Sequence, residues 1–529
     1  MIEVFEEGRL IKLPFCFMLF LQIMYRTLVI LFGLVLSFQV EGQVYPKEGS
    51  KLNYRIIGFS FPKIAKERQY TIQIAKGTYS RLDSFSKNII QTEQLKANRK
   101  IIEVPALGCQ YTWCIVYTEN KEQERSQLYH FSTQTCSRAD TTKFHIRILQ
   151  PAAEKYKDNY VSVDGGGVLY DMKGVPVWFI PDSNEYGGFV ADLKFTDEGT
   201  ITFIYKTPYV IDYCGNVLWK PLNTHEVSRD TLLGEMYHHE FTRLSNGHYM
   251  ALGTKILPCK LSTKDSSYEV TGPRSPNDGV VNIRFGTLIE YDEKGDVVWS
   301  WVSSKYLLSA DLAYYEANID SLKRFDPHEN AFFFDEKNKC IYLGFRNMNR
   351  IIKIAYPGGN VLSAYGENYK PGVPQIGANL FCNQHTIGRT KDGYLYIFEN
   401  NSCRIRDSLP TVVLLQEPVL PGDGLKKVKE YECTVDGLYP PGYPKIFGSG
   451  GNAKELPDGS FFINMGSEYS KLFIVDRSGE KVQWSALAER FMETDEKWTT
   501  MHEYRANIIN RKDLERMIWR SENTHVSDK

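Results

Sequence analysis

From about residue 145 onward, hydrophobic strands alternate with polar turns in two recurring patterns. In the first pattern, an acidic or Tyr-containing turn with a Gly precedes a hydrophobic strand that ends in Trp. It occurs at 170–179, 212–219, 291–299 and 475–484, with a degenerate copy that lacks the Trp at 354–365. In the second pattern, a turn that usually contains Gly precedes an alternating strand, at 195–205, 244–253, 335–345, 390–398 and 456–466. Repeats of β-units predict a β-propeller.

Pairing each second pattern with the first pattern that follows it predicts five blades, centred near residues 205, 270, 350, 405 and 470. The last strand, 502–509, pairs with 161–179 to complete a sixth blade, because a ring closed by both chain ends leaves no exposed sheet edge. We therefore predict an all-β chain with a six-bladed propeller over 145–529. An extra blade within 408–439 would make seven. Irregular inserts are expected at 258–278 and, with helix-like character, at 303–327.

Residues 43–137 read as short strands of alternating polarity that precede the propeller. This segment is predicted to form a small immunoglobulin- or fibronectin-III-like sandwich, with Trp113 and Phe131 in its core. His130 is expected to be structural. The polar stretch 137–144 is expected to be the linker.

The first 42 residues resemble an export leader. An apolar run at 27–38 follows Arg26, and Val40 and Gly42 are compact residues at the positions that precede cleavage after Gly42. Translation that begins at Met24 would explain the extra residues before this leader. A membrane anchor over 15–38 is the alternative.

Composition narrows the function further. The 529 residues carry 63 basic and 64 acidic side chains, for a net charge of −1, so nothing favours nucleic acid or an acidic membrane surface as a partner. Nine of the ten Cys lie beyond the leader, so at least one thiol is expected to be free. Cys109 with Cys136, or Cys382 with Cys403, are plausible disulfides in an exported chain.

Three histidines occupy related places in the repeat. His239 and His385 each stand eight residues before a turn glycine, and His328 precedes the turn at 335–339. Because innermost strands line the channel of a propeller, we predict that these imidazoles form one cluster. Strand alternation places His238 and His239 on opposite faces, so only one is expected to enter the channel. Register favours His239.

Arginines add positive charge to this cluster. Arg346 ends the strand after His328, and a planar guanidinium beside imidazoles is a ready anion site. Asn349 and Arg350 would supply further donors. His502 and Arg505 would approach from the last strand.

The segments HHEFTRLSNGHYMALG, FDPHENAFFFDEKNKCIYLGFRNMNRI and NQHTIGRTKDGYLYIFENN, with the later SGGNAKELPDGSFFINMGS, resemble the bacterial arylsulfate sulfotransferase family. The resemblance covers roughly 145–510, and the preceding sandwich is similar to that family's N-terminal domain. It implies a periplasmic enzyme that moves a sulfuryl group from a phenolic sulfate to a phenol through a sulfohistidine, without a cofactor or metal. A homo-oligomer is compatible with it, and membrane insertion after leader removal is not expected.

By the same resemblance, His385 would be the nucleophile, and His239, His328 and Arg346 would bind the sulfate and leaving oxygens. The predicted substrate-binding residues are His238, Asn330, Asn349, Arg350, His502 and Arg505. The chain departs from the family pattern at Glu240 and at Glu399-Asn400.

The chemistry requires a neutral nucleophilic imidazole whose other nitrogen is held by an acceptor. Arg346 and at least one protonated histidine would stabilise the negative charge that develops on the leaving oxygen. Two other classes remain open. Three neutral histidines could bind Mn, Fe or Zn in a metal-dependent propeller enzyme, although Arg346 would repel a cation. A non-catalytic propeller that binds a peptide or glycan is the other.

Overall fold

The computed structural model describes residues 2–6, 9–13, 44–63, 69–119, 122–222, 236–261, 268–270, 280–307, 311, 324–325, 327–366, 380–401, 409–419, 423–438, 449–466 and 469–524. Within these ranges the chain is all-β, with few and short helices. It divides into two compact units, Met1–Ser50 with Gly58–Ile102 and Gln110–Phe131, and Lys51–Ile57 with Glu103–Cys109 and Ser132–Lys529. No helix in the described ranges is both long and apolar enough to span a membrane.

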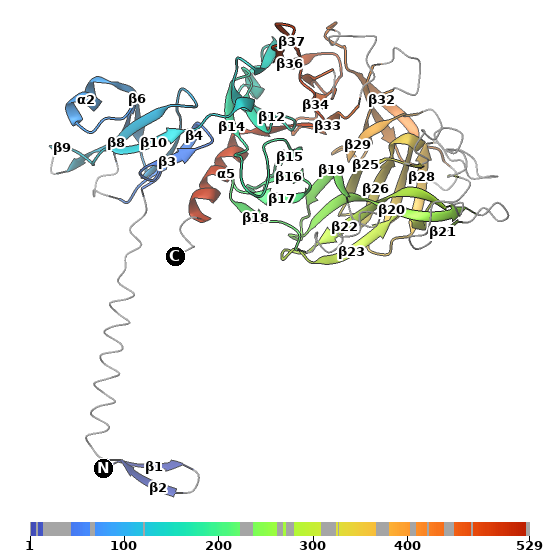
Figure 1. Ribbon diagram of the computed structural model, residues 1–529, viewed down its shortest axis with the longest axis horizontal. Coiled ribbons are helices and arrows are strands. Elements are labelled where there is room, and N and C mark those ends of the chain that lie inside the picture. Colours follow the sequence, from blue (N-terminus) through green and yellow to red (C-terminus); the bar gives the residue numbers. More distant parts are fainter. Residues whose placement is uncertain are drawn as a thin grey trace. The chain divides into compact units, whose positions relative to one another are not determined.

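The strands of the first 135 residues form three sheets (Figure 1). The larger has the order β3-β10-β8-β5-β6, with β9 beside β8, and a two-stranded sheet pairs β4 with β7. Trp113 and Phe131 are buried, as predicted for core residues. The bounds are β3 Ser50–Leu52, β4 Ile56–Ser60, β5 Tyr70–Lys76, α2 Leu82–Lys87, β6 Ile89–Leu95, β7 Arg99–Glu103, β8 Gln110–Glu119, β9 Glu122–Arg125 and β10 Tyr129–Thr133.

Most of the predicted leader lies outside the described residues. Within 1–42 the described part is the hairpin of β1 (Ile2–Glu6) and β2 (Arg9–Leu13). The alternative start at Met24 and the apolar run at 27–38 fall among the residues that are not described.

The segment expected to be a polar linker is structured instead. Arg138, in the 3-10 helix η1 (Ser137–Ala139), is buried because its guanidinium donates to the carbonyls of Gly166 and Ile180 and pairs with Asp182. The next strand, β11 (Phe144–Gln150), pairs with β36. A polar sequence was therefore mistaken for a linker because its charge is neutralised inside the second unit.

The second unit consists of antiparallel sheets in a propeller-like arrangement (Figure 1). Their strand orders are β38-β12-β13-β14, β15-β16-β17-β18, β19-β20-β22-β23, β25-β26-β27-β28, β29-β30-β31-β32 and β33-β34-β35-β36-β11. The strands β21, β24 and β37 attach at the side of these sheets.

The first half of the second unit contains β12 Asn159–Val163, β13 Val168–Asp171, β14 Pro176–Phe179, β15 Ala191–Phe195, β16 Ile201–Tyr205, β17 Thr207–Ile211, β18 Val217–Trp219, β19 Met236–Arg243, β20 Tyr249–Leu261, β21 Tyr268–Val270, β22 Val280–Tyr291 and β23 Val297–Val302, with η2 Glu154–Tyr156 before them and η3 Ser303–Lys305 after them.

The second half contains β24 Arg324–Phe325, β25 Glu329–Asp335, β26 Cys340–Phe345, η4 Arg346–Met348, β27 Arg350–Ala355, β28 Val361–Gly366, β29 Gln384–Arg389, β30 Leu395–Glu399, β31 Thr411–Gln416, β32 Lys426–Glu432, β33 Asn452–Glu455, β34 Phe461–Asn464, β35 Lys471–Val475, β36 Val482–Met492, β37 Lys497–Thr500, β38 Ala506–Asn510 and α5 Arg511–Thr524.

The first strands of these sheets contact one another in series. Contacts join β38 to β15, β15 to β19, β19 to β25, β25 to β29 and β29 to β33, and β34 returns to β38. The predicted pairing of the last strand with the first is confirmed, because β38 pairs with β12. That strand begins at Ala506, however, so His502 precedes it. The segment 408–439 adds no extra blade in its described part, because β31 and β32 belong to the sheet of β29.

The repeated tryptophans explain why the first pattern recurs. Each indole N–H donates to a backbone carbonyl in a turn of the neighbouring sheet: Trp178 to Tyr213, Trp219 to Asp292, Trp299 to Pro357 and Trp484 to Met172, at 2.8–3.2 Å. In the sheets without such a Trp, a tyrosine hydroxyl forms the hydrogen bond to the next sheet. The Tyr365 hydroxyl donates to Glu417, and that of Tyr431 donates to the Arg477 carbonyl. The outer strands are thus linked from sheet to sheet.

The insert at 258–278 extends a hairpin. β20 and β22 pair along their whole length, and β21 adds to β20. Most of the helix-like insert at 303–327 lies outside the described residues.

One predicted disulfide is wrong. Cys109 and Cys136 are both free, and their backbone carbonyls accept hydrogen bonds from Thr133 and Ala139 in separate turns. Cys382 is disulfide-bonded. Its predicted partner, Cys403, lies outside the described residues.

Candidate active site

The inner strands carry an unusual backbone feature. Asp192, His239, His328 and Asn383 all have positive φ values, between 50° and 64°. This left-handed conformation is rare for non-glycine residues and produces an irregularity at the start of the sheet. The pairing registers of β15, β19, β25 and β29 accordingly shift at or just after these residues.

The bulge in β19 overturns the prediction about His238 and His239. Their Nδ1 atoms lie 2.5 Å apart, and their ring centroids are separated by 4.5 Å. Strand alternation fails here because His239 has a φ of 64°, which breaks the two-residue repeat. Both imidazoles therefore lie on the same side of the strand, and His238 contacts Thr254 through Nε2.

The predicted imidazole cluster is present. The rings of His239 and His328 are 5.1 Å apart, edge to face. Tyr504 lies against both sides of the cluster, with its ring centroid 5.2 Å from that of His239 and 6.1 Å from that of His385. The equal spacing from the turns was only an approximate guide, however. His239 and His328 are themselves the left-handed residues, whereas His385 follows two residues after left-handed Asn383.

His385 is buried and its ring orientation is defined by three neighbours. The Gly450 backbone N–H donates to Nε2 at 3.2 Å, so Nε2 carries no proton. In a neutral imidazole the proton is then on Nδ1, which donates to the Asn383 carbonyl at 3.2 Å. The Asn400 amide approaches Nδ1 at 2.7 Å through Nδ2, while its buried Oδ1 has no partner in the described part of the chain; this tautomer therefore requires the amide turned so that Oδ1 accepts from Nδ1. The Asn383 carbonyl is thus the acceptor that the sequence required but did not identify.

His385, which is buried, and His239, which is half-buried, both have a pKa well below the usual range. Burial lowers the pKa of His385 well below its usual range, and Arg346, His328 and Arg505 lower it further. Burial likewise lowers the pKa of His239, together with His238, His328 and His385. The expected protonated histidine is therefore neither of these two, because each would place a second charge beside an arginine in a desolvated site.

Arg346 is linked to His328 through the backbone. The Arg346 N–H donates to the His328 carbonyl at 2.9 Å, where the bulge of β25 meets the end of β26. Asn383 donates through Nδ2 to the Arg346 carbonyl at 3.4 Å. The guanidinium donates to Asn347 at 3.1 Å. These contacts bring the arginine next to the loop that holds His385.

Asn400 and Tyr504 are site residues that sequence reasoning missed, and Glu399, noted only as a departure from the family pattern, supports them. Glu399 accepts from the Cys382 N–H at 2.7 Å and from the Thr411 hydroxyl at 2.9 Å, so it anchors the chain three residues before His385. Tyr504 was missed because the prediction rested on histidines at matching positions of the repeat. Its adjacency to Arg505 was the single available signal.

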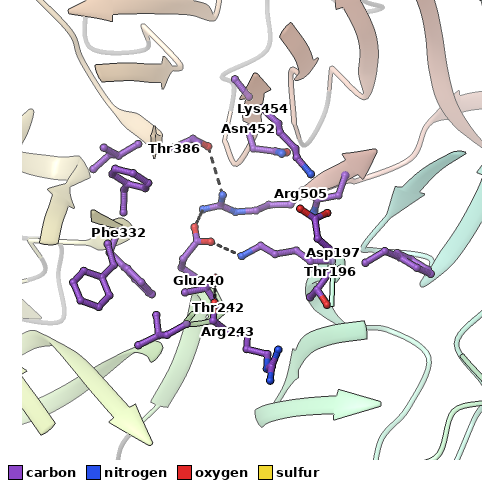
Figure 2. A pocket seen from close by; sticks show the side chains of 18 of the residues that line it. Thr196, Asp197, Glu240, Thr242, Arg243, Phe332, Thr386, Asn452, Lys454 and Arg505 are labelled. Carbon is purple, nitrogen blue, oxygen red and sulfur yellow. Dashed lines mark hydrogen bonds and ion pairs between the residues drawn. The ribbon is translucent and has the colours of Figure 1, made fainter. Parts of the chain in front are cut away.

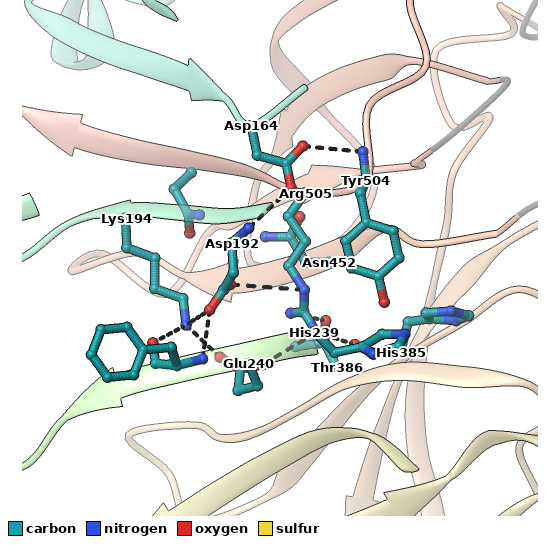
Figure 3. A network of polar contacts seen from close by, with 12 residues as sticks. Asp164, Asp192, Lys194, His239, Glu240, His385, Thr386, Asn452, Tyr504 and Arg505 are labelled. Atoms are coloured by element: carbon teal, nitrogen blue, oxygen red, sulfur yellow. Dashed lines mark hydrogen bonds and ion pairs between the residues drawn. The ribbon is translucent and has the colours of Figure 1, made fainter. Parts of the chain in front are cut away.

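A buried charged layer lies beside the imidazoles (Figure 3). Arg505 donates to the carbonyls of His385 and Asn330, at 3.0 and 3.2 Å, and contacts Glu240 at 3.2 Å. Lys194 pairs with Glu240 and with Asp192, the latter at 2.7 Å. Figure 3 shows His239, His385 and Tyr504 on one side of the Arg505 guanidinium and Lys194 on the other.

Charge in this layer is compensated internally. Burial raises the pKa of Asp192 to about 7, against the opposing effects of Lys194 and Arg505. The pKa of Glu240 is lowered: burial alone would raise it, and Lys194 and Arg505 more than offset this. Arg505, predicted to bind substrate, holds the backbone of two inner strands, β25 and β29.

The remaining predicted residues are mostly structural. Asn330 is buried and donates to the Gln384 carbonyl at 2.6 Å. Asn349 accepts from the Asn383 N–H at 2.9 Å. Arg350 is fully buried against Asp311, at 3.1 Å, and Tyr306. His502 is exposed. In the described ranges, no three His, Cys, Asp or Glu side chains are grouped so as to hold a metal ion.

The chain thus combines a propeller-like all-β fold with an imidazole cluster and arginines near the inner strands. The model of the arylsulfotransferase (ASST) family matches residues 119–413, more than half of the chain. The chain belongs to this family, which supports a sulfotransferase enzyme with small-molecule aryl substrates. A comparison with curated proteins finds no match.

Solved structures are only distantly similar. A protein of unknown function from Bacteroides caccae is 13% identical over 69% of this chain and 99% of its own, with a TM-score of 0.38. A periplasmic gluconolactonase from Pseudomonas aeruginosa is 11% identical over 83% and 99%, with a TM-score of 0.27. The β-propeller domain of Cps50 (Swd1) from Myceliophteria thermophila is 10% identical over 64% and 88%, with a TM-score of 0.29.

Proposed function

We propose that the chain transfers a sulfuryl group from a phenolic sulfate ester to a phenol, in two steps, through a sulfohistidine at His385. The observation that carries this proposal is the state of His385. It is a buried imidazole with a lowered pKa whose Nε2 accepts a hydrogen bond from the Gly450 N–H, beside Arg346 and two further histidines. A neutral imidazole is a competent nucleophile at neutral pH.

In the first step, the Nε2 lone pair attacks sulfur and the bond from sulfur to the aryl oxygen breaks. The electron pair of that bond leaves with the phenolate, and the sulfuryl group stays on Nε2. The long hydrogen bond from Gly450 to Nε2 opens as the new bond forms. The Arg346 guanidinium stabilises the charge that grows on the sulfate and leaving oxygens, an effect worth about 2.7–4 kcal/mol for one donor in a dry site.

In the second step, the hydroxyl oxygen of the acceptor phenol attacks the sulfuryl sulfur and the electron pair of the nitrogen–sulfur bond returns to Nε2. The phenol proton passes to a neutral imidazole, and His239 is suited to accept it because its pKa is lowered by burial and its neighbours. Tyr504 remains a protonated phenol, since burial raises its pKa, and its ring covers His239 and His385.

The fold and location complete the proposal. We infer a six-bladed propeller from the serial contacts of the inner strands and from the Trp and Tyr bonds that link each outer strand to the next sheet. The N-terminal sheets are proposed to form an immunoglobulin- or fibronectin-III-like sandwich. The apolar run at 27–38 supports export to the periplasm.

The direct test incubates the purified chain with 4-nitrophenyl sulfate, with and without phenol, and follows nitrophenolate. Release that depends on phenol, survives a chelator and yields phenyl sulfate is the expected result. Acid-labile, base-stable sulfate on His385 after brief mixing without phenol would identify the intermediate. Sustained release without an acceptor would instead identify a sulfate ester hydrolase. No release with a panel of aryl sulfates would favour a binding protein.

A further inference from the structure

A cavity lies at the inner strands, apart from the imidazole cluster. Its volume is about 350 Å³, and its walls come from the inner strands of several sheets, with Thr196, Thr242, Phe332, Thr386, Lys454 and Arg505 among its lining residues (Figure 2). His239, His328, His385 and Arg346 do not line it. A cavity of this size fits a small organic ligand.

The charged layer separates this cavity from the imidazoles. Arg505, Glu240 and Lys194 all line it, and the Arg505 guanidinium donates both to the Thr386 hydroxyl in the cavity wall and to the His385 carbonyl. Glu240 pairs with both cations. The charged layer therefore forms part of the cavity wall and also contacts the His385 backbone, whereas the groups proposed for sulfuryl transfer do not line the cavity.

Two cations of the cavity form no direct side-chain ion pair in the described part of the chain, although Asp197 and Asp513 act on one of them, Lys454, at longer range. Lys194 and Arg505 are paired, whereas Arg243 of β19 and Lys454 of β33 form no ion pair or hydrogen bond there. Lys454 is exposed, and Figure 2 shows it and Arg243 on opposite walls. Glu336 also lines the cavity, and it accepts hydrogen bonds from the Ser245 N–H.

The rest of the wall has an apolar face. Phe332 and Ile387 are buried and Tyr396 is half-buried, and all three border the cavity. Thr196, Thr242 and Thr386 add hydroxyls to the wall, and the Thr386 hydroxyl accepts from Arg505 (Figure 2). An anionic group with an aromatic body matches this division, because a carboxylate pairs with an ammonium while a ring packs on phenylalanine.

We propose that this cavity is a second binding site, for a small aromatic carboxylate, with Lys454 as the principal partner of the carboxylate and Arg243 as the alternative cation. The site is independent of the sulfuryl-transfer chemistry. It needs no bond to form or break, and it stands whether or not His385 is a nucleophile.

The test measures binding of benzoate to the full chain by calorimetry and by saturation-transfer NMR. Benzyl alcohol and cyclohexanecarboxylate serve as ligands that lack the charge or the ring. Lys454→Gln is expected to weaken benzoate binding roughly tenfold, the loss of one charge-assisted hydrogen bond. Arg243→Gln is expected to weaken it less. The matched control is Lys173→Gln, an exposed lysine in a turn outside the cavity.

His385→Ala separates this site from the active site. Benzoate binding that persists in His385→Ala and falls in Lys454→Gln supports the second site, even if no aryl sulfate is ever turned over. Binding that is lost in His385→Ala assigns benzoate to the active site and overturns the proposal. Equal affinity for benzoate and benzyl alcohol, or no benzoate binding by the unaltered chain, also overturns it, and neither result depends on a variant that folds.

Discussion

The outer and inner edges of the propeller-like sheets are built on opposite principles. At the outer edge, a similar hydrogen bond recurs from sheet to sheet: an indole N–H or a phenol hydroxyl of one sheet donates to a backbone carbonyl in a turn of the next sheet. At the inner edge, the strands share a left-handed residue, but the side chains there differ: Asp192, His239, His328 and Asn383. Uniform bonds hold the ring together, and a uniform backbone distortion presents different chemistry in each sheet.

Substitutions at the two edges should therefore affect different properties of the protein. An outer-edge change should alter stability and leave the chemistry of the folded molecules intact. An inner-edge change should alter chemistry first. The charged layer around Arg505 lies between these cases, because it is buried like the core and touches the backbone of His385.

The largest effect is expected at the inner edge. His385→Ala removes the proposed nucleophile and should lower the transfer rate by at least about 10³-fold. Circular dichroism and the melting temperature should stay near those of the unaltered chain. His385→Asn is the control that keeps a polar side chain at this position and the fold. An unchanged transfer rate in the Ala variant would sink the sulfohistidine mechanism.

Arg505→Met tests the intermediate layer. The substitution leaves Glu240 and Asp192 with Lys194 as their remaining cation and should destabilise the fold by about 3–5 kcal/mol, as for a broken buried ion pair. Urea unfolding measures this loss. A kcat that falls while KM for the donor stays constant would show that Arg505 positions His385. A rise in KM alone would return Arg505 to substrate binding.

Tyr504→Phe removes a hydroxyl while keeping the ring that lies against His239 and His385. If the phenol donates to the transferring group, kcat should fall about 10²-fold, the low end for a proton-donating group. Steady-state rates with two donors of different leaving-group acidity provide the measurement. The ring's packing role is tested separately by Tyr504→Leu. Equal rates for the Phe variant and the unaltered chain would limit Tyr504 to packing.

At the outer edge, Trp178→Phe deletes one bond to the Tyr213 carbonyl at 2.8 Å. We expect a loss of about 1 kcal/mol in the free energy of unfolding, the net value of one hydrogen bond. Tyr431→Phe removes the corresponding bond to Arg477 and should cost a similar amount. Turnover per folded molecule should be unaffected in both. A loss of turnover without a loss of stability would contradict the division between the two edges.

The smallest effect is expected from mild acid. The pKa of His385 in the folded chain is lowered below the ordinary value of 6.5, so the ring stays neutral and nucleophilic as pH falls from 7 to 6. In the unfolded chain the ring gains a proton in that range, so stability contributed by His385 and His239 is present above pH 6.5 and declines below it. Rates and urea midpoints measured across pH 5–8 should diverge accordingly. A rate that follows a pKa of 6.5 would contradict burial of a neutral nucleophile.

Much of the fold was readable from the sequence because the outer edge is periodic. A Gly turn and a Trp at a constant offset report a strand pair and its bond to the next sheet, both local in the chain. The tyrosines Tyr365 and Tyr431 escaped notice because a different residue forms the equivalent bond. The sequence also did not predict that Arg138 is buried, because the carbonyl groups that it binds are distant in sequence.

The sequence by itself determined the imidazole cluster, the closing pair of strands and the family resemblance, because each rests on residue types at regular spacing. Only the tertiary structure decided that His238 and His239 lie together, since a single left-handed residue cancels strand alternation. It alone decided the state of His385 as well, because the proton position depends on Gly450 and Asn383 and the charge depends on burial. Periodic spacing is a local property of the sequence, whereas backbone distortion and desolvation depend on how distant parts of the chain pack together.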